Sequence, residues 1–152
     1  MAGHAAEAVG SRELPEQPRQ VWEALAVLRP YCAVCDVSYR VTGRGRGSTF
    51  VCLPGRVDGD VEGAAGTRGE IEEWQPPRRV TTRLVRSGET WTTRLELTGT
   101  GTGGTRVTMT IRCTPERAGL VGVLQRRALQ RLVDRTLATE LDRLPAHLSQ
   151  GA

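Results

Sequence analysis

The sequence contains no lysine and no asparagine, so all 21 of its cationic side chains are arginine. Without lysine, the chain can form neither a Schiff base through a lysine amine nor a complete Walker-type phosphate loop. Histidine is scarce: His4 and His147 lie near opposite ends of the sequence, and acid/base catalysis centred on histidine is therefore not expected. These absences exclude several common routes to catalysis.

Long hydrophobic runs are absent as well, and no segment approaches the roughly 20 apolar residues that a membrane span needs. Residues 1–10 lack the basic start and apolar stretch of a secretory signal, which predicts a cytoplasmic protein. The net charge is +4, but the arginines alternate with acidic residues along the chain. Because no basic block or known binding motif accompanies the charge, we expect no nucleic-acid partner.

The length of 152 residues is typical of one domain with a hydrophobic core or a modest cavity. We expect a single domain over residues 1–152, with residues 1–6 flexible and residues 145–152 forming a tail. The sequence leaves open whether the protein is a monomer or a homodimer.

Turn residues divide the first half of the chain into short elements. Residues 7–14 predict a strand, and residues 19–28 predict a short helix whose apolar side chains recur at intervals of three and four. Alternation predicts a strand over residues 34–41, with Ser38 facing outward, and a second strand over residues 48–53 after the glycine-spaced turn at residues 43–47. Residues 54–66 are rich in Gly and Asp and predict an exposed loop.

The second half predicts four more strands, over residues 68–74, 79–86, 89–98 and 105–113. In the last two, one face is apolar and the other is polar, as in an antiparallel sheet that is covered on one side. The predicted inner face consists of Trp91, Thr93, Leu95, Leu97, Val107, Met109, Ile111 and Cys113.

A long helix is predicted to follow and to cover that face. We expect it to begin at Thr114 and Pro115 and to end near Leu144. Its expected apolar stripe contains Leu120, Val121, Leu124, Ala128, Leu132, Leu137, Leu141 and Leu144. Gly119 and Gly122 lie near its start and predict close packing or a bend there.

Two segments carry a resemblance to a known superfamily. Residues 14–25, LPEQPRQVWEAL, resemble a strand exit followed by a "V-W" first helix, and residues 69–80, GEIEEWQPPRRV, resemble a strand, Pro-Pro turn and strand. Together with the long final helix they are similar to the SRPBCC superfamily, also called START-like or Bet v 1-like. The resemblance implies an α+β helix-grip fold: a curved antiparallel sheet of about seven strands wrapped around the C-terminal helix, with one or two short helices after the first strand.

Members of that superfamily include polyketide cyclases, lipid-transfer proteins and plain binding modules. The resemblance therefore implies that the chain binds a hydrophobic or polyketide-like small molecule, as a carrier or as a cofactor-free cyclase or dehydratase. The alternative is a non-enzymatic protein-interaction module with a filled core and an arginine-rich helix face. A pocket between sheet and helix would favour the first; a solid core would favour the second.

The candidate ligand-binding residues combine aromatic and aliphatic side chains with two threonines, because small-molecule sites have apolar walls and few polar groups. They are Tyr39, Phe50, Trp74, Thr82, Leu84, Trp91, Thr93, Leu95, Met109 and Leu124; the aromatic members can instead fill the core. Tyr39 and Glu73 are the catalytic candidates, although the neighbouring acidic residues Glu70 and Glu72 favour a solvated face. Arg83 or Arg86 can meet an acidic ligand group, whereas parity places Arg94 outside.

Cys32 and Cys35 form a Cys-x-x-Cys motif, which suits a redox pair or half of a zinc site. Cys52 and Cys113 stand alone, and no histidine lies near the pair in the sequence. Because a tetrahedral zinc site needs four ligands, we predict no metal site and interpret the cysteines as inert, buried strand residues.

Overall fold

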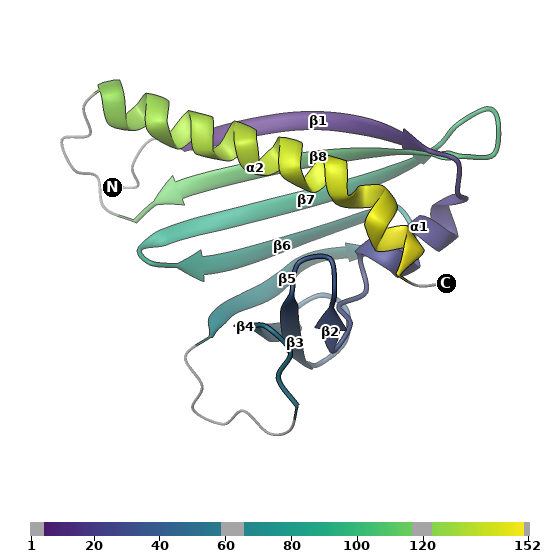
Figure 1. Ribbon diagram of the computed structural model, residues 1–152, viewed down its shortest axis with the longest axis horizontal. Coiled ribbons are helices and arrows are strands. Elements are labelled where there is room, and N and C mark those ends of the chain that lie inside the picture. Colours follow the sequence, from purple (N-terminus) through teal and green to yellow (C-terminus); the bar gives the residue numbers. More distant parts are fainter. Residues whose placement is uncertain (1–4, 59–65, 117–122, 151–152) are drawn as a thin grey trace.

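The computed structural model describes residues 5–58, 66–116 and 123–150. Its centre is a curved eight-stranded antiparallel sheet with strand order β1-β8-β7-β6-β5-β4-β3-β2 (Figure 1). The strands are β1 (Ala6–Leu14), β2 (Tyr31–Cys32), β3 (Val37–Thr42), β4 (Thr49–Pro54), β5 (Thr67–Gln75), β6 (Arg79–Arg86), β7 (Glu89–Gly99) and β8 (Thr105–Pro115). The first strand therefore pairs with the last, and β1 and β2 form the two edges. This is the helix-grip arrangement that the resemblance to the SRPBCC superfamily implies.

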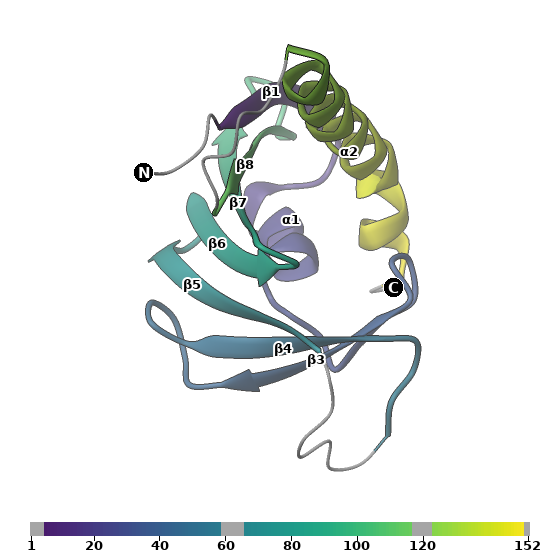
Figure 2. The same cartoon turned by 90° about the vertical axis from the view of Figure 1, so that its left-hand side faces the viewer.

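Two helices complete the fold. The short helix α1 (Pro18–Leu25) follows β1, and the long helix α2 (Val123–Ser149) crosses the concave side of the sheet. Figure 2 shows the sheet curving on one side, with α2 on the other side. The helix makes its main contacts with β1, β8 and α1, so it covers one edge region of the sheet rather than its centre.

The start of α1 has the predicted helix chemistry. Pro18 occupies the first turn, where its missing N–H breaks no helical hydrogen bond. The backbone N–H of Gln17 donates a hydrogen bond of 3.1 Å to Oε1 of Gln20, which supplies a partner for a backbone donor at the helix entry. Val21 and Trp22 are buried, and they fix α1 against the core.

Close approach of α2 to β1 depends on Gly10. A Cβ atom at this position would lie 2.8 Å from Cδ1 of Leu141 and 3.2 Å from Cδ2 of Leu137. Real side chains do not pack that closely without moving. The absence of a side chain at Gly10 therefore lets two leucines of α2 lie directly on the backbone of the first strand.

Several sequence expectations need correction. The sheet has eight strands rather than about seven, because residues 31–32 form the short strand β2. Residues 33–36 form a turn, so the strand expected over residues 34–41 begins at Val37. Ser38 was expected to face outward but is buried. In the described part of the chain, α1 is the one short helix between β1 and β2, which agrees with the expected one or two short helices.

The ends of the long helix also differ from expectation. Thr114 and Pro115 do not start the helix, because they pair with Thr90 and Glu89 as the end of β8. Gly119, Leu120, Val121 and Gly122 lie outside the described residues. At its other end the helix runs through the expected tail as far as Ser149. Ala6, expected to be flexible, is buried at the start of β1.

No helix in the described ranges has the length and apolar character needed to cross a membrane.

We predict that Gly104→Ala destabilises the protein by about 1–3 kcal/mol, the usual cost of forcing an extra group into a packed site. A Cβ atom at Gly104 would overlap the backbone carbonyl of Leu14, and backbone cannot move aside as a side chain can. Urea denaturation measures the effect. The control is Gly101→Ala in the same turn, where no atom lies within 4 Å of the added Cβ. Equal stability of the two variants would show that the β1–β8 end tolerates the group.

Candidate ligand-binding pocket

A pocket of about 560 Å³ lies between the concave sheet and α2. Its sheet wall is formed by inward-facing residues of β6, β7 and β8, and its other walls come from α1, β3, β4 and α2. Its apolar lining residues are Leu25, Ala26, Leu28, Phe50, Val80, Leu84, Trp91, Leu95, Met109, Ile111, Leu132 and Leu144, and its polar lining residues include Cys35, Tyr39, Thr82, Thr93, Thr136, Glu140 and His147. Apolar side chains thus share the lining with hydroxyl, thiol, carboxyl, guanidinium and imidazole groups.

The alternation of side chains along β6, β7 and β8 determines which residues form the sheet wall of the pocket. Thr82 pairs with Thr93, and Leu95 pairs with Met109, so side chains of neighbouring strands point to the same side. The predicted inner face of β7 and β8 is confirmed: Leu97, Val107, Met109, Ile111 and Cys113 are buried, and Trp91, Thr93 and Leu95 line the pocket.

A bulge in β5 changes the parity of that strand. The register shifts between Ile71 and Glu73, so that Ile71 pairs with Thr82 and Trp74 pairs with Val80. Because Thr82 and Val80 both face inward, Ile71 and Trp74 do too, although simple alternation would separate them. Glu73 consequently lies on the outer face, where it forms ion pairs with Arg79 and Arg94.

Three of the candidate residues do not line the pocket. Trp74 packs edge to face on Trp22 with ring centroids 5.0 Å apart, so it fills the core beside α1. Leu124 is 80% exposed at the start of α2, because the buried stripe of the helix contains Val133 and Leu137 instead. Glu73 accepts a hydrogen bond from Oγ1 of Thr81 at 3.2 Å on the outer face. These three placements correct the candidate list.

The other eight candidates, Tyr39, Phe50, Thr82, Leu84, Trp91, Thr93, Leu95 and Met109, all line the pocket. Their role in binding stays a prediction. Of the three arginines considered, Arg86 lines the pocket, Arg83 pairs with Glu70 and Glu72, and Arg94 pairs with Glu73 on the outer face.

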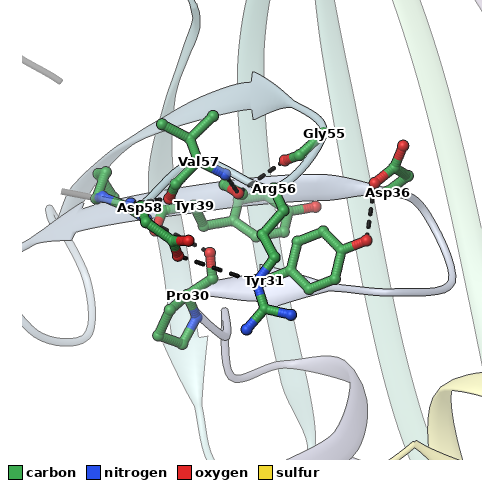
Figure 3. A network of polar contacts seen from close by, with 10 residues as sticks. Pro30, Tyr31, Asp36, Tyr39, Gly55, Arg56, Val57 and Asp58 are labelled. Atoms are coloured by element: carbon green, nitrogen blue, oxygen red, sulfur yellow. Dashed lines mark hydrogen bonds and ion pairs between the residues drawn. The ribbon is translucent and has the colours of Figure 1, made fainter.

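The edge of the sheet that carries Tyr39 is held by a polar network (Figure 3). Ser38 is fully buried. Its hydroxyl donates to the carbonyl of Gly55 at 2.8 Å and accepts from the N–H of Val57 at 2.9 Å, and these two hydrogen bonds offset the cost of burying it. The backbone N–H of Tyr39 donates to the carbonyl of Pro30 at 3.0 Å. Segment 55–58 is therefore hydrogen-bonded to Ser38 of β3, and the backbone of Tyr39 is held by Pro30. The ring of Tyr39 packs edge to face on Phe50 with a centroid distance of 6.3 Å.

The polar side chains that α2 contributes were missed by sequence reasoning. Thr136, Glu140 and His147 line the pocket together with the apolar Leu144, and the four residues recur at intervals of four, four and three. This spacing places them on one helix face, beside the face that carries Val133, Leu137 and Leu141. A polar series next to an apolar stripe was the available signal, but the sequence cannot say which of two adjacent faces meets a pocket.

Burial changes the ionisation of two of these lining groups. It raises the pKa of Tyr39 above its usual value, so the phenol stays protonated and can donate a hydrogen bond. It also raises the pKa of Glu140, with the charge of Arg143 acting in the opposite direction. The ion pair between Arg143 Nη1 and Glu140 Oε1 spans 3.6 Å. A carboxyl with a raised pKa keeps its proton to higher pH than an exposed carboxyl does.

His147 also lies next to the Cys-x-x-Cys motif, which corrects the expectation that no histidine is near it. Its Nδ1 is 3.8 Å from Sγ of Cys32, and its Nε2 is 3.8 Å from Sγ of Cys35. Cys35 lies in the turn after β2 and lines the pocket, so it is not a strand residue. The three side chains form the one group of potential metal ligands found among the described residues.

A comparison of the sequence with protein-family models assigns the chain to a family. The family model described as "Polyketide cyclase / dehydrase and lipid transport" matches residues 5–149. The chain belongs to this family. Membership confirms the resemblance to the SRPBCC superfamily. A search of curated proteins found none that matches the sequence.

Solved structures agree with this assignment at the level of the fold. A protein of unknown function from Staphylococcus aureus is 14% identical, with a TM-score of 0.72 over 97% of this chain and 96% of that one. The Zhui aromatase/cyclase from Streptomyces sp. R1128 is 15% identical, with a TM-score of 0.68 over 97% and 95%. A norcoclaurine synthase from Thalictrum flavum is 10% identical, with a TM-score of 0.64 over 100% and 99%. These three proteins share the fold of the chain.

We predict that Glu140→Gln removes a pH-dependent loss of stability. Because burial raises the pKa of Glu140 above its usual value of 4.5, the folded protein holds this proton more tightly than the unfolded chain. The free energy of unfolding therefore falls as pH rises from 4.5 through the raised pKa. The variant should match the wild type at about pH 4 and be more stable than the wild type at about pH 7.

Thermal denaturation between about pH 4 and pH 7 measures the effect. The charged and titratable groups that interact with Glu140 are Arg143 on α2, and Cys35 and Tyr39 on the sheet side of the pocket. Asp142→Asn, on the exposed face of the same helix, is the control and should not reproduce the change. A Glu140→Gln variant less stable than the wild type at neutral pH would contradict the assignment of a buried, costly carboxylate.

Proposed function

We propose that this member of the polyketide cyclase/dehydrase and lipid transport family binds an apolar or polyketide-like small molecule in the pocket between the sheet and α2. The observation that carries the proposal is the pocket volume of about 560 Å³, which falls within the roughly 300–1,000 Å³ of typical small-molecule sites. Its aliphatic and aromatic walls favour a ligand with a large apolar surface.

The polar lining residues indicate a ligand that also carries oxygen atoms. Thr82 and Thr93 pair across β6 and β7, and their hydroxyl groups can donate to or accept from a ligand carbonyl or hydroxyl. Thr136 faces them from the helix side of the same pocket. A molecule that alternates apolar carbon with carbonyl or hydroxyl groups, as a polyketide does, fits such walls better than a plain hydrocarbon.

Cyclisation or dehydration of the bound molecule is the enzymatic form of the proposal. Holding a reactive chain in one folded conformation is itself a large part of such catalysis. The protonated hydroxyl of Tyr39 would donate a hydrogen bond to a ligand carbonyl, where negative charge develops as a neighbouring carbon loses its proton. Glu140 replaces Glu73 as the acidic candidate, because it lines the pocket and its raised pKa suits proton transfer.

The competing proposal, a protein-interaction module with a filled core, is less well supported. It requires solid packing between sheet and helix, whereas the pocket reaches from α1 to the β6–β7 turn. Arg126, Arg127 and Arg131 are exposed on α2, but exposed arginines on a helix are ordinary solvated residues. The pocket therefore favours small-molecule binding.

We predict that Trp91→Ala weakens ligand binding about tenfold or more, since the indole supplies a large apolar area to the pocket wall. Native mass spectrometry of protein purified from its own host identifies a retained ligand, and titration calorimetry measures its affinity. Thr92→Ala, on the outward face of the same strand and paired with Arg112, is the matched control. Absence of any retained ligand, together with no thermal shift across lipids and aromatic polyketides, would sink the binding proposal.

If turnover of a bound polyketide is detected, Tyr39→Phe should lower kcat by about 10- to 1,000-fold with little change in stability, because it removes one donor to a developing oxyanion. The phenyl ring keeps the contact with Phe50. Thr92→Ala again serves as the control and should retain full turnover. Unchanged kcat in Tyr39→Phe would exclude this hydroxyl from the chemistry and leave the carrier form of the proposal.

A further inference from the structure

Cys32, Cys35 and His147 converge at the end of the pocket where the β2–β3 hairpin meets the C-terminal end of α2. The three potential ligand atoms all lie within 4.8 Å of one another. Each sulfur is 3.8 Å from a nitrogen of the imidazole ring. In a tetrahedral zinc site, bonds of about 2.0–2.3 Å place neighbouring ligand atoms about 3.5–3.8 Å apart. The two 3.8 Å contacts involve different ring nitrogens, so binding through a single nitrogen requires a rotation of the imidazole and closure of spacings of up to 4.8 Å.

The fold builds this group from segments more than 100 residues apart in the sequence. Cys32 pairs with Val37, and the intervening turn is closed by Asp36 with a positive φ of 52°. A Cys-x-x-Cys motif in a tight hairpin turn brings two thiols together, which is a common arrangement for half of a zinc site. The N–H of Ala33 donates to Oε1 of Gln150 at 3.1 Å, and this bond holds the turn against the helix end that carries His147.

The chemistry of the group suits a metal better than a set of hydrogen bonds. The polar contacts found for the imidazole among the described residues are the two sulfurs and Nε2 of Gln150 at 3.5 Å. Thiols are weak hydrogen-bond donors and acceptors, so these contacts compensate little for the partial burial of the imidazole ring. Two thiolates and an imidazole form a soft ligand set of the kind that selects zinc.

The charges of this ligand set also suit a divalent ion. Two thiolates neutralise one Zn²⁺ ion, and an imidazole binds the metal in its neutral form.

We infer that Cys32, Cys35 and His147 bind a single Zn²⁺ ion whose fourth coordination position opens toward the pocket. Cys35 and His147 both line the pocket, and the described residues provide no fourth thiol, imidazole or carboxylate in the group. A zinc ion with three protein ligands keeps a position for water or for an oxygen atom of a bound molecule. The metal site is defined without reference to what fills the pocket, so it stands apart from the proposed function.

The test is a titration of the reduced, chelator-treated full chain with Zn²⁺ and with Co²⁺, in the absence of any small molecule. We expect one equivalent to bind, with the visible absorption of a tetrahedral cobalt ion and thiolate-to-cobalt charge transfer. At a hundredfold excess of free Zn²⁺ over Kd, the thermal midpoint should rise by about 5–10 °C.

Variants identify the ligands. Cys32→Ser, Cys35→Ser and His147→Gln should each weaken Zn²⁺ binding by more than about 100-fold, since loss of an outer-shell partner alone costs 10- to 100-fold. The matched control is Cys52→Ser, which removes another pocket-lining thiol and should leave the affinity unchanged. Alkylation of the wild-type protein is a second measurement that needs no variant: Zn²⁺ should protect Cys32 and Cys35 selectively.

Three outcomes would overturn the proposal. The first is that the reduced wild type takes up no metal. The second is that the ligand variants bind Zn²⁺ as tightly as the wild type, and the third is that Zn²⁺ protects all cysteines equally. Failure to bind metal, combined with a Cys32–Cys35 disulfide in protein purified without reductant, would assign the pair to redox chemistry instead. None of these results depends on Trp91→Ala or on a retained ligand, so the metal site and the pocket proposal can fail independently.

Discussion

The packing of α2 along β1 and β8 is the contact on which the rest of the structure depends. Leu137 and Leu141 lie on the backbone of β1 at Gly10, and Val133 is fully buried in the same stripe. Because the first and last strands are neighbours in the sheet, one helix can cover both of them. In the described part of the chain, α2 makes its main contacts with β1 and β8 rather than with β6 and β7, and the pocket occupies the space between α2 and those two strands.

This placement gives α2 two adjacent faces with different roles. One face buries apolar side chains against β1 and β8 and contributes to stability through the area removed from water. The next face presents Leu132, Thr136, Glu140 and His147 to the pocket. A polar group on the second face costs less than it would on the first, since a pocket leaves room for water or ligand atoms to satisfy it. The longest helix can therefore carry Thr136, Glu140 and His147 at the pocket without weakening its main packing contact with β1 and β8.

The C-terminal end of α2 lies beside the pocket and is hydrogen-bonded to the turn that follows the edge strand β2. Gln150 bonds to the β2–β3 turn and accepts a hydrogen bond from Arg29 through its carbonyl at 3.4 Å. Segment 55–58 fixes the same edge from the outside through Ser38. Tyr39, Cys35 and His147 thus belong to one well-supported end of the pocket, while Trp91 and Arg86 belong to the end near the β6–β7 turn.

The sequence by itself determined seven of the eight strands, the inner face of β7 and β8, the long final helix and the family resemblance, because alternation and turn chemistry are local signals. Tertiary structure decided what local periodicity cannot encode. The bulge before Glu73 placed Trp74 inside and Glu73 outside, docking chose Val133 and Glu140 over Leu124 as inward residues, and strand order brought His147 to Cys32 and Cys35. Each of these depends on contacts between distant segments, whose geometry follows from the packing of the whole sheet against α2.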